Sequence, residues 1–204
     1  MRKYSYKSYD EYVAAQVQAN LAKLKNTFAC PYVLNEIVNV FRETRKLEPR
    51  SILCHGARNG SELTWFSQTV PGARVVGTDI SPTAEDHGLV MWDFHKRNPS
   101  WSGLFDIVYT NSFDHAIEPE LAVHSIMDSV SDRGFLVIEY NEECDNEKSV
   151  NKTDCFGASR EEYLALVHEC GFEVFVDKLV PYNAKSPSNH KYPRRLFFIQ
   201  SKNK

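Results

Sequence analysis

The sequence has no apolar run long enough to span a membrane, and its basic N-terminus, MRKYSYKSYDEYVAAQ, lacks the apolar core of a signal peptide. An excess of one charge is also missing, because the formal net charge is −3 and the isoelectric point is about 6.2. Such a surface as a whole attracts neither nucleic acid nor anionic lipid. We therefore expect a cytoplasmic protein without a nucleic-acid or membrane partner; the sequence leaves its oligomeric state open.

Cysteines are few and scattered: the five are Cys30, Cys54, Cys144, Cys155 and Cys170. They form no CxxC pair and no Cys/His zinc spacing, so we expect reduced thiols and no metal. Internal repeats and domain-sized linkers are also missing. The 204 residues, 42% hydrophobic and 25% charged, suit one globular domain rather than a disordered or fibrous chain.

The first fifty residues have a helical pattern. Asp10 is the expected N-cap of a helix over residues 11–25, because apolar residues recur there at helical spacing (Val13, Val17, Leu21 and Leu24). A second helix is predicted from Pro31, a residue that fits the first turn, and it ends before Pro49. Its apolar positions are Val33, Leu34, Ile37, Val38 and Phe41.

From residue 51 onward, short apolar runs alternate with helix-like stretches. Strands are predicted over residues 51–55, 74–77, 89–92, 105–110, 134–140, 172–180 and 195–200, and helices over 60–69, 119–130 and 160–170. The last two strands have no helix between them and predict an antiparallel hairpin. The sequence thus predicts an α/β fold: a Rossmann-like, doubly wound, mostly parallel seven-stranded sheet with helices on both faces and a C-terminal antiparallel hairpin. We interpret residues 1–48 as a helical extension that packs on the domain formed by residues 49–204.

Candidate ligand-binding residues follow the first predicted strand, because parallel sheets bind ligands at the carboxyl ends of their strands. The segment is His55-Gly56-Ala57-Arg58-Asn59-Gly60-Ser61-Glu62. Gly56 and Gly60 permit a tight turn and a close backbone approach before a helix N-terminus. Asn59 and Glu62 fit a capping box, a structural role that we favour over ligand contact for Glu62.

Acidic residues end the next two predicted strands. Asp79, in GTDI, lies about twenty residues after the glycine turn, where a carboxylate can accept both hydroxyl protons of a ribose. It can instead cap the turn before Ser81-Pro82. The following strand ends in Trp92-Asp93-Phe94-His95. Asp93 can accept from the exocyclic amine of a base, and either aromatic can stack on the ring or belong to the core.

With these motifs in place, the chain from about residue 51 onward resembles class I S-adenosylmethionine-dependent methyltransferases. ILCHGARNGSE resembles the glycine-rich first motif of that family, GTDIS its acidic second-strand motif and WDF its adenine-contacting segment. FDIVYTNS and RGFLVIEY resemble its fourth and fifth strands. The resemblance implies S-adenosyl-L-methionine as the cofactor, with the ribose at Asp79, the adenine amino group at Asp93 and the methionine portion at the Gly56–Gly60 turn. The candidate cofactor-binding residues are His55, Gly56, Ala57, Arg58, Gly60, Asp79, Ile80, Asp93, Phe94 and Asn111.

Two residues depart from the family pattern. The family usually has an acidic residue where this chain has Cys54 and a glycine where it has Arg58. Cys54 supplies no charge for the amino group of the cofactor, whereas Arg58 either pairs with the methionine carboxylate or obstructs the cleft. HGxRNGxE, WDFH and NSFDH also resemble a subfamily of methyltransferase-like proteins, and that likeness assigns no substrate.

Candidate catalytic residues follow the fourth predicted strand, in Asn111-Ser112-Phe113-Asp114-His115. Methyl transfer is a direct displacement that requires alignment of the acceptor, and a base only if the acceptor must lose a proton. His115 is the candidate general base, with Asp114 as its partner. In the alternative interpretation Asp114 caps the turn and His115 faces solvent. His95 is a second candidate base.

Two loops flank the expected acceptor side, over residues 141–156 and 185–195. The second carries basic residues, with Tyr182 before them and Tyr192 among them, and these residues either recognise an anion or are simply solvated. This basic cluster consists of Lys185, His190, Lys191, Arg194 and Arg195.

The sequence therefore predicts a methyltransferase for a small or medium-sized metabolite, a sugar or glycan precursor included. Two alternatives stay open. Cys54 and Arg58 motivate a non-catalytic binding or interaction module of the same fold. The glycine turn with Asp79 also suits a nicotinamide-dependent oxidoreductase, although the helix-free last strand pair argues against it. No Asn/Asp-Pro-Pro-aromatic motif follows the fourth strand, which removes the usual signature of nucleic-acid amino-methyltransferases.

Overall fold

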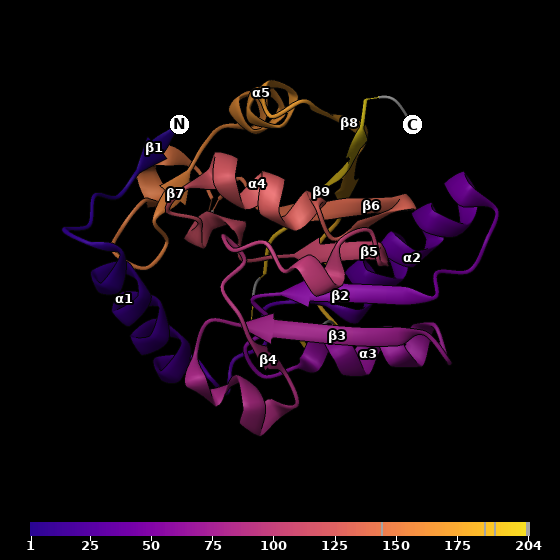
Figure 1. The fold of residues 1–204 in the computed structure, drawn as a ribbon, viewed down its shortest axis with the longest axis horizontal. Helices are drawn as coiled ribbons and strands as arrows, with labels where there is room; N and C mark the ends of the chain where they lie inside the picture. The colour runs from indigo at the N-terminus through magenta and orange to yellow at the C-terminus, as the bar shows by residue number, and fades with distance from the viewer. Residues whose placement is uncertain (144, 186, 190, 203–204) are drawn as a thin grey trace.

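The computed structural model describes residues 1–143, 145–185, 187–189 and 191–202. A seven-stranded sheet with the order β4-β3-β2-β5-β6-β9-β8 forms its centre (Figure 1). The strands are β2 (Ser51–His55), β3 (Arg74–Asp79), β4 (Val90–Met91), β5 (Phe105–Thr110), β6 (Val130–Tyr140), β8 (Phe172–Val180) and β9 (Arg194–Ser201). β2 to β6 are parallel, and β9 runs antiparallel to both of its neighbours, β6 and β8. The predicted fold class, with its C-terminal antiparallel hairpin, is confirmed.

Helices cover both faces of the sheet. The helices are α1 (Tyr9–Ala22), α2 (Pro31–Arg45), α3 (Ser61–Thr69), α4 (Pro119–Met127) and α5 (Arg160–Glu169). α2 and α3 pack on one face, and α4 and α5 on the other (Figure 1). Side chains alternate along each strand. Ile52 and Cys54 therefore belong to the core beneath α2 and α3, while Leu53 belongs to the core beneath α4 and α5. This alternation explains why the central strands read as unbroken apolar runs.

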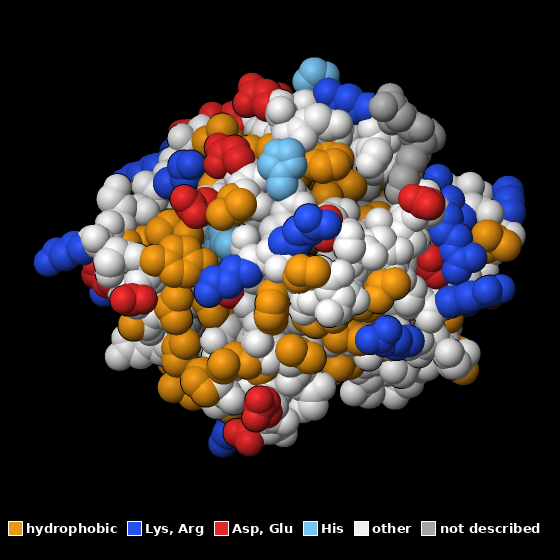
Figure 2. Space-filling model, viewed as in Figure 1, with side chains coloured by type: hydrophobic (Ala, Val, Ile, Leu, Met, Phe, Trp, Pro, Cys, Tyr) orange, Lys and Arg blue, Asp and Glu red, His pale blue; other side chains and the backbone are white. Residues whose placement is uncertain are grey.

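The two N-terminal helices bury different kinds of side chain. In α2, the five predicted apolar positions are all fully buried. In α1, the predicted apolar stripe is wrong as the buried face: Leu21 is 52% exposed, whereas Gln16 and Asn20 are buried. The helix also begins earlier than predicted, because Ser8 rather than Asp10 is the N-cap and its side chain accepts from the backbone of Glu11. Figure 2 shows hydrophobic side chains exposed over α1 and β4, as expected for a helix whose polar face lies inward.

A short strand pair, which the sequence did not predict, holds the N-terminus. β1 (Arg2–Lys3) pairs antiparallel with β7 (Phe156–Gly157), in the segment after β6. α1, which follows β1, therefore lies at the edge toward which β2 and β3 point (Figure 1). Among the described residues, no helix is both long and apolar enough to cross a membrane.

Candidate active site

Two adjoining cavities lie at the carboxyl ends of the central strands. The larger has a volume of about 180 Å³ and the smaller about 50 Å³. Both are lined by Lys23, Gly56, Arg58, Ser112 and His115. The strand order reverses between β2 and β5, and open α/β sheets bind ligands at that point.

The smaller cavity brings together the predicted nucleoside residues. Asp79 and Ile80 reach it from the end of β3, and Asp93 and Phe94 from the segment after β4. Trp92 also lines it, and the inward face of α1 closes the opposite side. Acidic and aromatic side chains from two neighbouring strand ends therefore share one wall.

Asp79 is fully engaged by hydrogen bonds. Its Oδ2 accepts from the backbone N–H of Arg58 at 2.9 Å, and its Oδ1 accepts from the backbone N–H of Ser81 at 2.9 Å. The Nδ2 of Asn20, on α1, donates to the same Oδ1 at 2.8 Å. The turn-capping role, one of the two interpretations of Asp79, is thus present, and the carboxylate also ties the glycine turn and α1 together.

Asp93 is likewise held by neighbours. Its Oδ1 accepts from the backbone N–H of His95 at 3.0 Å and lies 2.9 Å from the ring Nδ1 of that residue, while the Tyr9 hydroxyl donates to its Oδ2. Burial alone would raise the pKa of Asp93, but the hydrogen bonds from His95 and Tyr9 outweigh it and lower the pKa. His95 is buried and lines neither cavity, so its predicted role as a second base has no geometric support.

The glycine turn has an unusual backbone at Arg58. Gly56 and Gly60 have φ values of 70° and 72°, and Arg58 has a φ of 43°, in the left-handed region that favours glycine. A Cβ at Gly56 would lie 2.6 Å from Ser112 Oγ, so the turn requires glycine there. Arg58 lines both cavities. Its guanidinium carbon lies 4.7 Å from the Phe28 ring centroid, and its buried Nε has no hydrogen-bond partner among the described residues.

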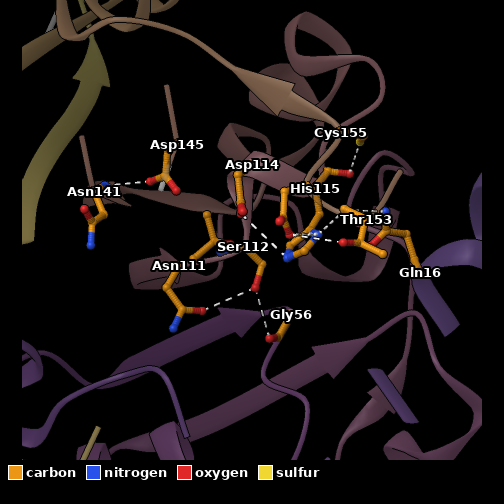
Figure 3. Close-up of polar contacts among 12 residues, drawn as sticks. Gln16, Gly56, Asn111, Ser112, Asp114, His115, Asn141, Asp145, Thr153 and Cys155 are labelled. Carbon is orange, nitrogen blue, oxygen red and sulfur yellow. Dashed lines mark hydrogen bonds and ion pairs between the residues drawn. The ribbon is translucent and has the colours of Figure 1, made fainter. Parts of the chain in front are cut away.

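The two predicted catalytic residues meet at the larger cavity. His115 Nδ1 lies 2.7 Å from the carbonyl oxygen of Thr153, and because a carbonyl only accepts, Nδ1 carries the hydrogen. His115 Nε2 lies 3.7 Å from Asp114 Oδ1, and Figure 3 shows the two side chains pointing toward each other. The interpretation in which His115 simply faces solvent is wrong. Asn111 lies beside the pair and accepts from Ser112 Oγ at 3.3 Å (Figure 3).

Several carboxylates line the larger cavity. Glu139 is compensated, because its Oε1 lies 2.6 Å from Arg194 Nε and its Oε2 accepts from the Tyr109 hydroxyl at 2.5 Å. Asp145 accepts from a backbone N–H at 2.6 Å, and burial together with the nearby Asp114 raises its pKa well above the usual range. The remaining acidic residues of the cavity are Glu62, Asp114 and Asp154. No metal was expected from the sequence, yet ligand atoms of Asp114, His115 and Asp154 lie within 4.8 Å of one another.

Two predicted cofactor residues lie away from both cavities, and the predicted capping box is not formed. His55 and Gly60 line neither cavity. Burial lowers the pKa of His55 to about 3, and its Nδ1 lies 2.9 Å from Thr78 Oγ1, so the residue supports the strand end as a neutral imidazole. The capping box of Asn59 and Glu62 is wrong, because Gly60 is the N-cap of α3 and no side chain caps it. Ala57 lines the larger cavity, as predicted for the turn.

The predicted basic cluster of the second loop does not form a surface at the site. Arg194 is buried against Glu139, and Arg195 Nη1 lies 2.6 Å from Asp177 Oδ1. His190 lies outside the described residues. None of the other four members lines either cavity. Arg194 and Arg195 are thus paired with carboxylates of the fold, and anion recognition stays a prediction for Lys185 and Lys191.

Site residues of α1 were missed by the sequence reasoning. Beyond the contacts of Tyr9 and Asn20, Gln16 Nε2 donates to the Thr153 carbonyl at 2.9 Å, and the Tyr12 hydroxyl donates to the His115 carbonyl at 3.1 Å. Tyr12, Gln16 and Asn20 are spaced by four residues. This spacing was the available signal for one inward helix face, and the neighbouring apolar stripe obscured it.

The chain matches no protein-family model and no curated protein sequence. Its fold is similar to that of the 1,6-didemethyltoxoflavin-N1-methyltransferase of Burkholderia thailandensis, solved with S-adenosylhomocysteine, with a TM-score of 0.68 and 12% identity over 97% of this chain and 92% of that one. The plantazolicin methyltransferase BpumL, in complex with a pentazolic analogue and S-adenosylhomocysteine, gives a TM-score of 0.69 and 13% identity over 95% and 96% of the two chains.

The [4+2]-cyclase SpnF also has a similar fold, with a TM-score of 0.53 and 17% identity over 71% of this chain and 59% of that one. At these identities the likeness is one of fold. Because a cyclase and methyltransferases share it, the reaction must be argued from the site itself.

Proposed function

We propose that this chain is an S-adenosylmethionine-dependent methyltransferase that acts on a small or medium-sized metabolite. The observation that carries the proposal is the pair of adjoining cavities. One has acidic and aromatic side chains suited to a nucleoside, and the other extends past Gly56 and Arg58 to the Asp114–His115 pair. A ligand with a nucleoside at one end and a charged tail with a reactive centre at the other fits this layout. The S-adenosylhomocysteine bound in proteins of similar fold supports the same ligand.

Each part of the cofactor has a partner of matching chemistry. The Asp79 carboxylate accepts from the ribose hydroxyls, and Asp93 accepts from the adenine amino group. Phe94 and Ile80 contact the base. Arg58, which lines both cavities, forms a charge-assisted pair with the methionine carboxylate through its guanidinium group.

Cofactor binding requires α1 to shift. The smaller cavity, at about 50 Å³, has room for only a few water molecules, each of which needs at least roughly 10–15 Å³ of such space. A nucleoside is larger, and Asn20 and Tyr9 already donate to Asp79 and Asp93. The N-terminal extension therefore acts as a cover over the cofactor site, and the nucleoside displaces these two side chains when it binds.

The residues of this chain handle the acceptor and its proton. When bound, S-adenosylmethionine supplies a methyl group on a sulfonium that needs no activation by the protein. His115 Nε2, whose lone pair is fixed by the Nδ1 bond to Thr153, receives the proton that the acceptor loses. Asp114 stabilises the resulting imidazolium from 3.7 Å. The polar lining of the larger cavity suits an acceptor with hydroxyl or amino groups, a sugar or glycan precursor included.

Titration calorimetry with S-adenosylmethionine, S-adenosylhomocysteine and NADH tests the proposal. We expect binding in the micromolar range for the first two compounds and none for NADH. Absence of heat with both S-adenosyl compounds near millimolar concentration would refute the methyltransferase, and binding of NADH alone would favour the oxidoreductase. The Asp114–His115 pair at a cavity is the observation against a purely non-catalytic module.

A further inference from the structure

We infer that Glu62 supplies the carboxylate that receives the ammonium group of the methionine portion, in place of the acidic residue missing at Cys54. This inference rests on the proposed function and adds a residue to it. Glu62 is the second residue of α3, directly after the glycine turn, and it lines the larger cavity beside Arg58. It also lies close enough to Cys54 for its charge to raise the pKa of that thiol, in addition to the larger effect of burial. The charge that is missing from the end of β2 is thus present at the same place, on the following helix.

The fold itself makes no use of one oxygen of this carboxylate. Glu62 is 6% exposed, and its buried Oε2 has no hydrogen-bond partner among the described residues. Burying an ionisable group without a partner is unfavourable, so residues of this kind gather where a ligand completes them. Burial raises the pKa of Glu62 to about 7, which places its ionisation near neutral pH. The N-cap of α3 is Gly60, so Glu62 is not the residue that begins the helix.

The neighbouring carboxylates are engaged elsewhere. Glu139 is held by Arg194 and Tyr109, and Asp145 accepts from a backbone N–H. Asp114 faces His115. Glu62 is therefore the cavity carboxylate with a free buried oxygen in the described part of the chain.

Glu62 and Arg58 together match a zwitterionic amino-acid tail. Arg58, in the turn, offers a cation with an unpartnered Nε. Glu62, four positions later on α3, offers a carboxylate with an unpartnered Oε2. A tail with one ammonium and one carboxylate satisfies both groups at once. The pairing predicts a proton change: the ammonium stabilises the ionised form, so binding near pH 6.5 releases a proton from Glu62.

Three nucleoside ligands test whether Glu62 binds the ammonium group or only supports the fold. S-Adenosylhomocysteine has both tail charges, its decarboxylated analogue keeps the amine alone, and 5′-methylthioadenosine has neither. We compare the full chain with Glu62→Gln and with Glu43→Gln, a charge-matched control at an exposed position of α2. At pH 8, Glu62→Gln should weaken S-adenosylhomocysteine and the decarboxylated analogue on the order of ten- to hundredfold and leave 5′-methylthioadenosine unchanged.

Calorimetry in buffers of different ionisation enthalpy adds a second readout. Near pH 6.5 the parent chain and Glu43→Gln should release a proton on binding S-adenosylhomocysteine, and Glu62→Gln should not. The inference is overturned if Glu62→Gln binds all three ligands like the parent chain, or if it loses equal affinity for all three. If the parent chain binds none of the ligands, the proposed function fails as well, so the two failures are distinguishable.

Discussion

Asp79 holds several parts of the fold together at the position where we propose that it also binds a ribose. Two of its hydrogen bonds come from backbone groups of its own sheet edge, at Arg58 and Ser81, and these fix the glycine turn against β3. The third comes from Asn20 on α1. A ribose can replace the Asn20 amide without disturbing the backbone donors, because only that donor comes from a separate, peripheral helix.

Asp79→Ala should therefore change two measurements. Loss of a charged acceptor should weaken S-adenosylhomocysteine binding by about 1–3 kcal/mol, and loss of the turn cap should lower the free energy of unfolding by a similar amount. Asp79→Asn should lose less binding affinity and less stability, because an amide keeps one acceptor oxygen. Calorimetry and urea unfolding measure the two effects. Unchanged affinity in a folded Asp79→Ala variant would leave the residue with the turn cap alone.

Arg58 should have opposite effects on the stability of the turn and on ligand binding. A non-glycine residue in the left-handed region costs roughly 1–2 kcal/mol, so Arg58→Gly removes strain while it removes the contact with Phe28. We expect unfolding stability to stay within about 1 kcal/mol of the parent chain. Binding of S-adenosylhomocysteine should nevertheless weaken in Arg58→Gly and also in Arg58→Lys, because a point charge cannot reproduce the planar fork. Equal or tighter binding by Arg58→Gly, measured by calorimetry, would refute the proposed contact between Arg58 and the methionine carboxylate.

The ionisation of buried Glu62 should lower the free energy of unfolding as the pH rises. Its ordinary pKa is 4.5, and burial raises the value in the folded state to about 7. Between these values the native state keeps a proton that the unfolded state has released, so the free energy of unfolding falls as pH rises toward 7. Glu62→Gln removes this loss and should be more stable than the parent chain at pH 8, on the order of 1–3 kcal/mol, with little difference at pH 4.5. Urea unfolding at the two pH values is the check; a pH-independent difference would contradict the buried ionisation.

At the scale of elements, α1 and α2 show what sequence patterns can and cannot predict. α2 packs against the sheet, so its apolar periodicity directly reports its buried face. α1 packs against strand ends, whose exposed groups are carboxylates and carbonyls, and its buried face is therefore polar. A hydrophobic pattern cannot identify such a face, because the partner surface is assembled from several strands far apart in the sequence.

The same reasoning distinguishes the parts of the site that could be predicted from the sequence from those that could not. Asp79, Asp93 and the glycine turn follow parallel strands directly, and strand direction alone brings them to one edge. The partner of His115, in contrast, is the Thr153 carbonyl from the loop after β6, and Glu139 on β6 pairs with Arg194 on the neighbouring strand β9. Those contacts depend on how loops and side chains pack, which no local spacing encodes.

Tyr9 should restrain cofactor entry. Its hydroxyl donates to Asp93, where the adenine amino group is expected, so Tyr9→Phe removes a competing donor. The variant should bind S-adenosylhomocysteine a few-fold more tightly, in line with about 1 kcal/mol for a hydrogen bond, and with a faster association rate by stopped-flow fluorescence. Lys7→Ala, at an exposed position just before α1, is the matched control. Weaker binding by Tyr9→Phe would instead mean that the hydroxyl contacts the bound nucleoside.

At the scale of the whole molecule, the N-terminal segment divides into two parts with different roles. α2 contributes five fully buried apolar side chains to the core that it shares with α3 and the sheet. At roughly 1.5–3 kcal/mol for each buried side chain, their removal would cost about as much as the entire stability of an ordinary domain. α1 buries only Tyr12 and Ala15 among its apolar residues and otherwise contacts the site through polar groups. We therefore propose that the folding unit begins near α2 rather than after residue 48.

Two deletions test that division. Removal of residues 1–28 takes away β1 and α1, and the remaining chain should still unfold cooperatively in urea, because both faces of the sheet keep their helices. Removal of residues 1–48 also takes away α2 and exposes the apolar face of β2, β5 and β6, so this chain should show no cooperative transition by circular dichroism or tryptophan fluorescence. A cooperative transition in the longer deletion would restore a boundary at residue 48. Loss of cooperativity in the shorter one would make α1 part of the folding unit, and the polar face of that helix would then be a structural contact rather than a cover that moves.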